Sequence, residues 1–297
     1  MSKTKTLCWT TSVAKTALNQ WLAPLGLAFV FLNLLTACND SREVRIATGQ
    51  VKELLFQVSY VPAHPNQTES RIQGRIEGLV AHLEQQFSSQ YPDSQISRLN
   101  QWQSTQPVVL TRELEELLLA GLNAHALSGG EMPMFFHTSP LNEPASVRVV
   151  NHQLFKSTED VQVDMELVLH GFIVDRVAHL MELMNVENYR IDINGQVRAR
   201  GFDLERKPWN IDVSNGETLQ LADASVGQSQ TISGAHILVV HESSAAATAL
   251  SAWFAAMGTD TALEKASALS IPLEIQLDEN GSPKSYTSPA FQSAFSG

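Results

Sequence analysis

The dipeptide Asn194-Gly195 most constrains how this chain can fold. It lies between two short segments in which apolar and polar residues alternate, 189–193 and 196–199. An Asn-Gly pair favours the two-residue turn of a β-hairpin, so these segments are predicted to be adjacent antiparallel strands. The same dipeptide at 215–216 and 280–281 predicts two more hairpins, 209–213 with 217–221 and 273–277 with a strand from Ser285. Further strands are expected at 51–61 and 236–241.

Helical periodicity alternates with these hairpins. Apolar residues recur at spacings of three, four and seven at Ile72, Ile76, Leu79, Val80, Leu83 and Phe87. A second helix is predicted over 112–127, with Thr111 as N-cap and Gly129-Gly130 as its end. Others are expected at 168–184, 245–257 and 260–268, and the proline-containing stretch 131–160 is expected to be irregular. Helices among hairpins indicate an α+β fold with antiparallel sheets.

The N-terminal segment resembles an export signal. Three lysines precede an apolar run from Trp21 to Leu35, which is too short for a confident membrane span. The run ends in Leu35-Thr36-Ala37-Cys38, the pattern of a bacterial lipobox. We therefore expect a signal peptide at 1–37, lipidation of Cys38, a tether at 38–48 and a single domain at 49–297. An uncleaved anchor helix is the alternative.

Cysteine count and charge limit the function classes. Cys8 would leave with the signal and Cys38 would carry lipid, which excludes cysteine nucleophiles and zinc–thiolate sites. The remaining chain has 17 basic and 31 acidic side chains, a net charge of −14. Nucleic acid and anionic lipid surfaces are unfavourable partners for such a charge. The expected location is the periplasmic side of a bacterial membrane.

Four segments carry a family resemblance. They are YPDSQISRLN at 91–100, VDMELVLHGFIVDRV at 163–177, IDINGQVRARG at 191–201 and ATALSAWFAAMG at 247–258. In this order they resemble the ApbE-like family of periplasmic FAD:protein FMN transferases over about residues 46–293. The resemblance implies an ApbE-like, T-fold-like architecture. It also implies FAD, Mg²⁺ and a partner protein that accepts FMN on a threonine.

The positions that carry the family's chemistry differ. The family's M-G-T falls on Lys52-Glu53-Leu54, its glycine pair on Glu166-Leu167 and its lysine on His170. Its metal-binding Asp and Thr fall on Thr248 and Ala252, whereas Mg²⁺ prefers hard oxygen ligands. The family's H-I-I-D-P-x-T-G loop has no counterpart. By resemblance Asp164 and His170 are the candidate flavin-binding residues. No metal ligand is assigned, because Leu167, Thr248 and Ala252 occupy those positions, and no catalytic residue is named.

Three hypotheses remain open. The first is a catalytically degenerate, anchored lipoprotein that acts through a periplasmic or membrane protein partner and needs no cofactor. The second is an active Mg²⁺-dependent transferase that uses FAD to flavinylate a threonine of a redox protein. The third is a flavin-binding protein without transfer activity. A degenerate cleft is expected to be filled by Leu167, Leu169 and Met134. Asp164 and Glu166 could form a small acidic site, although acids at helix starts are common.

Overall fold

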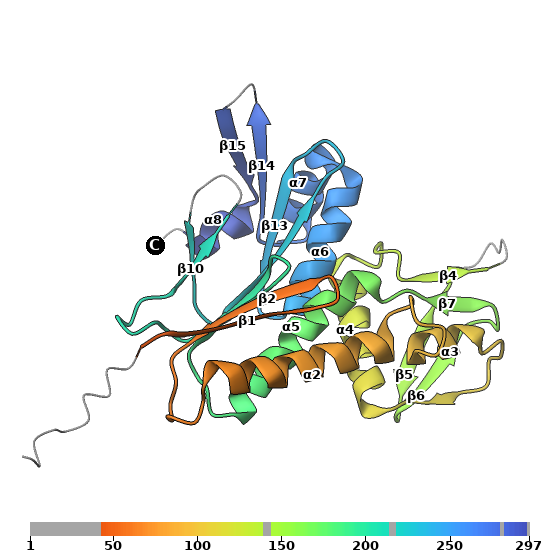
Figure 1. The fold of residues 1–297 in the computed structure, drawn as a ribbon. Coiled ribbons are helices and arrows are strands. Elements are labelled where there is room, and N and C mark those ends of the chain that lie inside the picture. Colours follow the sequence, from red (N-terminus) through yellow and green to blue (C-terminus); the bar gives the residue numbers. More distant parts are fainter. Residues whose placement is uncertain (1–42, 139–143, 214–217, 280–281, 296–297) are drawn as a thin grey trace, which may run out of the picture. The chain divides into compact units, whose positions relative to one another are not determined.

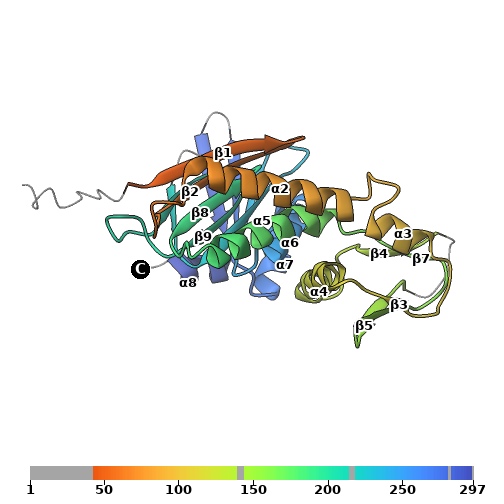
Figure 2. The ribbon, with the colours of Figure 1, turned by 60° about the horizontal axis from the view of Figure 1, so that its bottom comes forward.

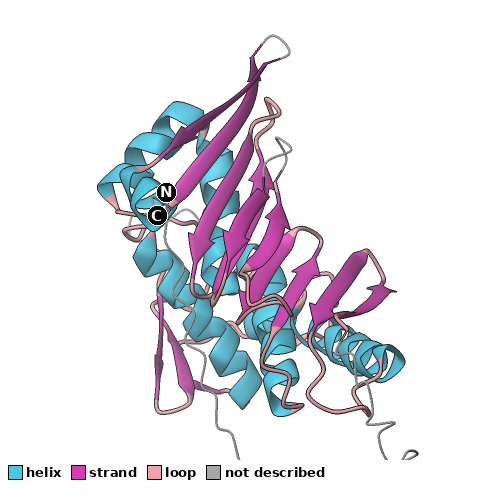
Figure 3. Ribbon diagram, turned by 90° about the vertical axis from the view of Figure 1, so that its left-hand side faces the viewer, coloured by secondary structure: helices cyan, strands magenta, loops and turns pink. Residues whose placement is uncertain are grey.

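Eight strands form the central sheet of the computed structural model, which describes residues 43–138, 144–213, 218–279 and 282–295 (Figure 1). The strands lie in the order β1-β2-β8-β9-β12-β13-β14-β15. Their bounds are β1 Arg45–Val51, β2 Leu54–Tyr60, β8 Tyr189–Ile193, β9 Gln196–Arg200, β12 Ala224–Gln230, β13 His236–His241, β14 Leu273–Glu279 and β15 Ser282–Thr287. All neighbouring strands are antiparallel, which confirms the predicted α+β class (Figure 3).

The predicted turn at Asn194-Gly195 joins β8 to β9. Both residues have positive φ, 48° and 80°, as a type I′ turn requires. The Asn194 side chain also accepts a hydrogen bond from the backbone N–H of Leu55 at 2.8 Å and donates one to the carbonyl of Glu53 at 3.1 Å. The turn therefore also fixes β8 against β2. The turns predicted at 215–216 and 280–281 lie outside the described residues.

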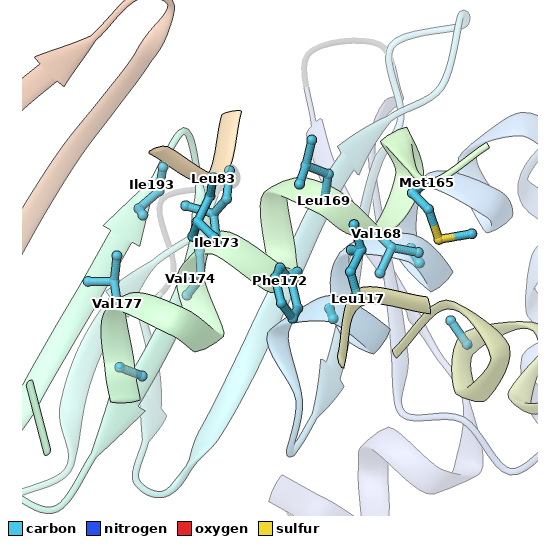
Figure 4. Packing of buried hydrophobic residues seen from close by; sticks show 14 of the residues in the cluster. Leu83, Leu117, Met165, Val168, Leu169, Phe172, Ile173, Val174, Val177 and Ile193 are labelled. Carbon is cyan, nitrogen blue, oxygen red and sulfur yellow. The ribbon is translucent and has the colours of Figure 1, made fainter. Parts of the chain in front are cut away.

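The larger helices pack on one face of this sheet (Figure 2). Helix bounds are α2 Glu69–Phe87, α3 Gln95–Gln101, α4 Arg112–Leu127, α5 Glu166–Leu183, α6 Ser244–Met257, α7 Thr259–Ala268 and α8 Pro289–Phe295. The main core lies between the sheet and α2, α4, α5 and α6, and Figure 4 shows α5 at its centre, with Phe172 and Ile173 pointing into it. Leu169 and Met134 are fully buried in this core, whereas Leu167 is only partly buried.

A second, smaller core lies on the opposite face of β9, β12 and β13. It is covered by a separate two-stranded sheet and by α8. That sheet consists of β10 Trp209–Asp212 and β11 Thr218–Leu221, in agreement with the predicted second hairpin. Val197, Val226 and Val240 point into this core, whereas Gln196 faces the helices.

Several elements differ from the sequence-based expectation. Residues 51–61 are not one strand, because Lys52 has a φ of 54° and turns β1 into β2. The motif segment 91–100 contains most of the additional helix α3, which was not predicted from the sequence; the Ser94 hydroxyl accepts a hydrogen bond from the backbone N–H of Ser97 at 3.0 Å and caps this helix. Short strands also occur in and beside the stretch expected to be irregular: β3 Val108–Val109, β4 Phe135–His137, β5 Val147–Val150, β6 Gln153–Lys156 and β7 Val161–Val163.

The N-terminal predictions fall mostly outside the described residues, including the signal peptide and Cys38. The predicted tether, 38–48, is too long at its C-terminal end because β1 begins at Arg45. None of the helices in the described part is both long and apolar enough to cross a bilayer. The described residues from Glu43 form one compact unit, and the described members of both cores lie between residues 47 and 295.

Candidate functional site

The start of α5 brings together the two residues predicted to bind flavin. Asp164 lies just before the helix, and its carboxylate accepts a hydrogen bond from the backbone N–H of Glu166 at 2.9 Å. It is exposed and thus accessible to a ligand. His170 lies six residues later, in the second turn of α5, and is also exposed. Both residues lie at the same end of α5.

Glu166 does not form an acidic pair with Asp164. Its carboxylate instead accepts hydrogen bonds from the backbone N–H and the hydroxyl of Ser89, both at 2.7 Å, and from the hydroxyl of Ser88 at 3.3 Å. These serines follow the last residue of α2. The carboxylate therefore ties the start of α5 to the end of α2. The Glu166 carboxylate thus occupies these backbone and hydroxyl donors, at a position where the family resemblance places a glycine.

Glu84 joins this group from the last turns of α2. Its Oε1 is buried, lies 4.0 Å from Nε2 of His170 and has no hydrogen-bond partner among the described residues. Burial raises the pKa of the Glu84 carboxyl above its usual range; His170 lowers this pKa, the Glu166 carboxylate raises it and Lys52 lowers it. Lys52 lies in the β1–β2 turn, and its ammonium is 3.9 Å from the centre of the Tyr91 ring. We call Lys52, Glu84, Glu166 and His170 the charged cluster.

The charged cluster was only partly foreseeable. Lys52, Glu166 and His170 stand at positions singled out by the resemblance, and the structure brings all three together. Glu84 was missed, because it lies on α2, 82 residues before Glu166, and a lone acid on a helix carries no signal of its role. Its place in the cluster depends on how α2 packs against α5.

Two of the family's metal positions, Thr248 and Ala252, lie on α6 next to this end of α5, and the third, Leu167, lies on α5 itself. A Cβ on Gly171 would lie only 2.2 Å from the carbonyl oxygen of Ser244 and 2.6 Å from the hydroxyl of Thr248, so the two helices touch. Thr248 is buried, and its hydroxyl donates to Oε1 of Gln196 at 2.9 Å. The same Gln196 oxygen accepts the backbone N–H of Gln228 at 3.1 Å. Thr248 is thus part of an internal network with the sheet.

Asp175, in the middle of α5, holds the start of α6. Its carboxylate accepts the backbone N–H groups of Ser244 at 2.9 Å and Ala245 at 3.0 Å, the hydroxyl of Ser243 at 2.9 Å and a guanidinium N–H of Arg198 at 2.8 Å. Four donors on one carboxylate cap the helix and fix its position relative to β9. Asp175 is therefore a structural residue of the α5–α6 pair.

Comparison with known proteins identifies the family. The model of the ApbE family matches residues 53–142 and 138–236. The chain belongs to the ApbE family. An FAD:protein FMN transferase of Haemophilus influenzae is 23% identical over 215 residues, which cover 62% of this chain and 62% of that protein. One of Vibrio cholerae is 24% identical over 221 residues, covering 66% and 65%. The matches thus span slightly less than two thirds of these relatives' own length.

Solved ApbE structures share the fold. The apo flavinyl transferase ApbE of Pseudomonas stutzeri superposes with a TM-score of 0.74 at 18% identity, covering 86% of this chain and 98% of that one. The flavin transferase ApbE of Vibrio cholerae gives a TM-score of 0.68 at 18% identity, covering 85% and 99%. At this identity the likeness concerns the fold alone. The expectation of an ApbE-like architecture is confirmed.

The residues at the ApbE metal and flavin positions do not fit the groups that the resemblance implies. Ala252 has no side-chain oxygen, and the Thr248 hydroxyl is buried against Gln196. Within the described ranges, no group of three His, Cys, Asp or Glu side chains could hold a metal ion. Glu84 and Glu166 place two carboxyl groups beside His170, and negative charge there disfavours a pyrophosphate. We therefore derive no reaction step through FAD or Mg²⁺.

Proposed function

We propose that this chain is a lipid-anchored periplasmic member of the ApbE family that has lost FMN transfer and acts through a protein partner. The observation that carries the loss of transfer is the Glu166 carboxylate, which takes the donors of Ser88 and Ser89 at a family glycine position. A carboxylate there opposes a phosphate both by volume and by charge. The substituted Thr248 and Ala252 support the same conclusion.

A flavinylation assay tests the loss of transfer. The chain, FAD, Mg²⁺ and a threonine-containing acceptor protein would be incubated, and covalent flavin would be read by in-gel fluorescence. The control is a relative that carries the family's metal-binding Asp and Thr, run with the same acceptor. We expect fluorescence on the acceptor only in the control. Transfer by this chain would refute the proposal and favour the alternative of an active enzyme with unidentified ligands.

The anchoring part of the proposal rests on the sequence LTAC at 35–38. A thioether-linked diacylglycerol with a further acyl chain would give stable attachment, whereas one chain alone is marginal. Cys38→Ser should leave the protein unprocessed or release it from the lipid-anchored fraction. A Cys8→Ser variant is the matched control and should fractionate like the parent. Equal fractionation of Cys38→Ser and the parent would show that the lipobox prediction is wrong.

An anchored protein of this fold without transfer activity can still bind another protein, and this is the reason for proposing a partner. By the sequence resemblance, the exposed end of α5 near His170 is the candidate reaction site, and we assign the partner's contact to it. A photo-crosslinking side chain at position 170 should give an adduct in cells with a periplasmic or membrane protein. The same side chain at exposed position 264 on α7 should not. Identical adduct patterns at the two positions would contradict a contact at this site.

A further inference from the structure

We propose that a cavity between the start of α2 and the end of α5 binds the phosphate headgroups of an anionic phospholipid surface. This inference rests on the proposed lipid anchor. The cavity has a volume of about 440 Å³ and is lined by residues of both helices and of the loop before α2. Its α2 residues, Arg71 and Arg75, belong to the start of that helix, whereas Glu84 of the charged cluster lies near the end of the same helix. The cavity is therefore separate from the candidate reaction site.

The charge of the cavity is positive in a strongly negative protein. Arg71 and Arg75 line it, one helical turn apart on α2, and His64 lies in the preceding loop. No carboxylate is among the described residues that line it. Neither arginine forms an ion pair with another described residue. Both guanidinium groups are exposed and free to bind phosphate oxygens, which they do with good geometry.

Apolar side chains lie beside the two arginines. Leu180 and Met184 of the α5 end contribute to the wall, and Leu183 is 69% exposed at the rim. A free inorganic anion would gain nothing from contact with this apolar surface. A phospholipid presents a phosphate next to a glycerol and acyl region, so the pairing of guanidinium and leucine suits it.

The place where the anchored chain enters the domain points to the same surface. Arg45, the first residue of β1, donates to the carbonyl of Gln67 at 2.8 Å, and Gln67 lines the cavity. Seven residue steps separate Arg45 from Cys38, which reach at most about 25 Å when fully extended. A lipid on Cys38 would therefore hold this end of the domain at the membrane.

The net charge alone would predict that the protein is repelled by an anionic membrane, since the chain after the predicted signal carries a charge of −14. Screening limits each surface charge to roughly 10 Å at moderate ionic strength, so the charges that face the membrane decide the contact. The cavity presents two arginines to it.

Vesicle co-sedimentation of the chain from residue 39 tests the proposal, because this chain contains the compact unit that begins at residue 42 and carries no lipid. It should bind vesicles that contain phosphatidylglycerol and not vesicles of phosphatidylcholine alone. Each basic residue at an anionic surface contributes about a factor of five, so Arg71→Gln with Arg75→Gln should weaken binding about 30-fold. Leu183→Ser should weaken it separately. Arg98→Gln with Arg148→Gln removes equal charge at the other end of α2 and should leave binding unchanged.

Three results would overturn the proposal. The parent chain could fail to bind either vesicle, the two arginine pairs could have equal effects, or inorganic phosphate could release the protein far better than chloride at equal ionic strength. The last result would make the cavity a site for soluble anions. Because the tested chain has no lipid, none of these results bears on whether Cys38 is lipidated. The Cys38→Ser experiment tests that part of the proposed function separately.

Discussion

At the scale of single residues, Glu84 shows how the charged cluster affects stability. The folded chain buries its carboxyl and raises its pKa, so the folded state binds a proton more readily than the unfolded state does. The free energy of unfolding therefore falls as pH rises from the unfolded pKa to the raised folded pKa. At neutral pH the buried charge is a net cost, which His170 and Lys52 only partly offset.

We predict that Glu84→Gln stabilises the protein at neutral pH. Removing the buried charge should raise the free energy of unfolding by about 1 kcal/mol, which corresponds to a melting temperature about 2–4 °C higher. The gain should vanish at a pH below the unfolded pKa of the carboxyl, because both states are then protonated. Thermal melts of both proteins across this pH range measure it. Glu264→Gln, at an exposed position, is the control and should have no effect.

A lower free energy of unfolding for Glu84→Gln at neutral pH would contradict this prediction. It would mean that His170 and Lys52 hold the charged carboxylate more strongly than burial opposes it. A double variant with His170→Gln would then identify the cation, since the loss should be smaller once His170 is absent.

At the scale of elements, the contact between α5 and α6 determines what the site can contain. Gly171 permits the close approach on the α5 side, and Asp175 caps α6 from the same helix. On the other side of α6, a Cβ on Gly227 of β12 would lie 2.1 Å from the carbonyl of Ala247. α6 is thus held between two glycines. This packing places Thr248 against Gln196 and makes its hydroxyl an internal group.

We predict that Gly171→Ala lowers the free energy of unfolding by about 2 kcal/mol or more. The new methyl group meets backbone of Ser244, which cannot move aside as a flexible side chain could. Urea unfolding followed by circular dichroism measures the change. The matched control is Gly74→Ala on α2, where nothing lies within 4 Å. There the substitution should raise stability by up to about 1 kcal/mol, because alanine favours helix. Equal effects at both sites would contradict the tight α5–α6 contact.

At the scale of the whole molecule, the scaffold matches ApbE while individual positions of the reaction site differ. The family model covers residues 53–236, and the ApbE structure of Pseudomonas stutzeri covers 86% of the chain. The differences at Glu166, Leu167, His170, Thr248 and Ala252 lie together at one end of α5 and along α6. The proposed loss of transfer would thus concern one part of the fold, because a shared scaffold does not determine the chemistry of its site.

We predict that restoring five side chains recovers FAD binding before transfer. The variant combines Glu166→Gly, Leu167→Gly, His170→Lys, Thr248→Asp and Ala252→Thr. The glycines remove the carboxylate and a bulky side chain, while the aspartate and threonine return oxygen ligands. Transfer should lag because the family's H-I-I-D-P loop is still absent. Quenching of FAD fluorescence reports binding, and His170→Lys alone is the control. A well-folded variant that binds no FAD would show that the cleft itself has changed shape.

Local patterns in the sequence were sufficient for most elements. The Asn194-Gly195 hairpin, the α2 periodicity and the cap at Thr111 involve neighbours in the chain, so each could be predicted without knowledge of the rest. The helix over 112–127 agrees with α4 at both ends. The four motif segments indicated the family, because they preserve order and spacing. These properties belong to the chain alone.

Only the tertiary structure decided the rest. β12 has the sequence ASVGQSQ, which shows no strand pattern, yet it is central because Gly227 lets α6 lie against it. The charged cluster draws Lys52, Glu84, Glu166 and His170 from three separate elements. The cavity at the other end of α2 likewise combines Arg71 and Arg75 with the end of α5. Such groupings depend on long-range packing, and a carboxylate acquires its pKa and its partners only when distant segments bury it.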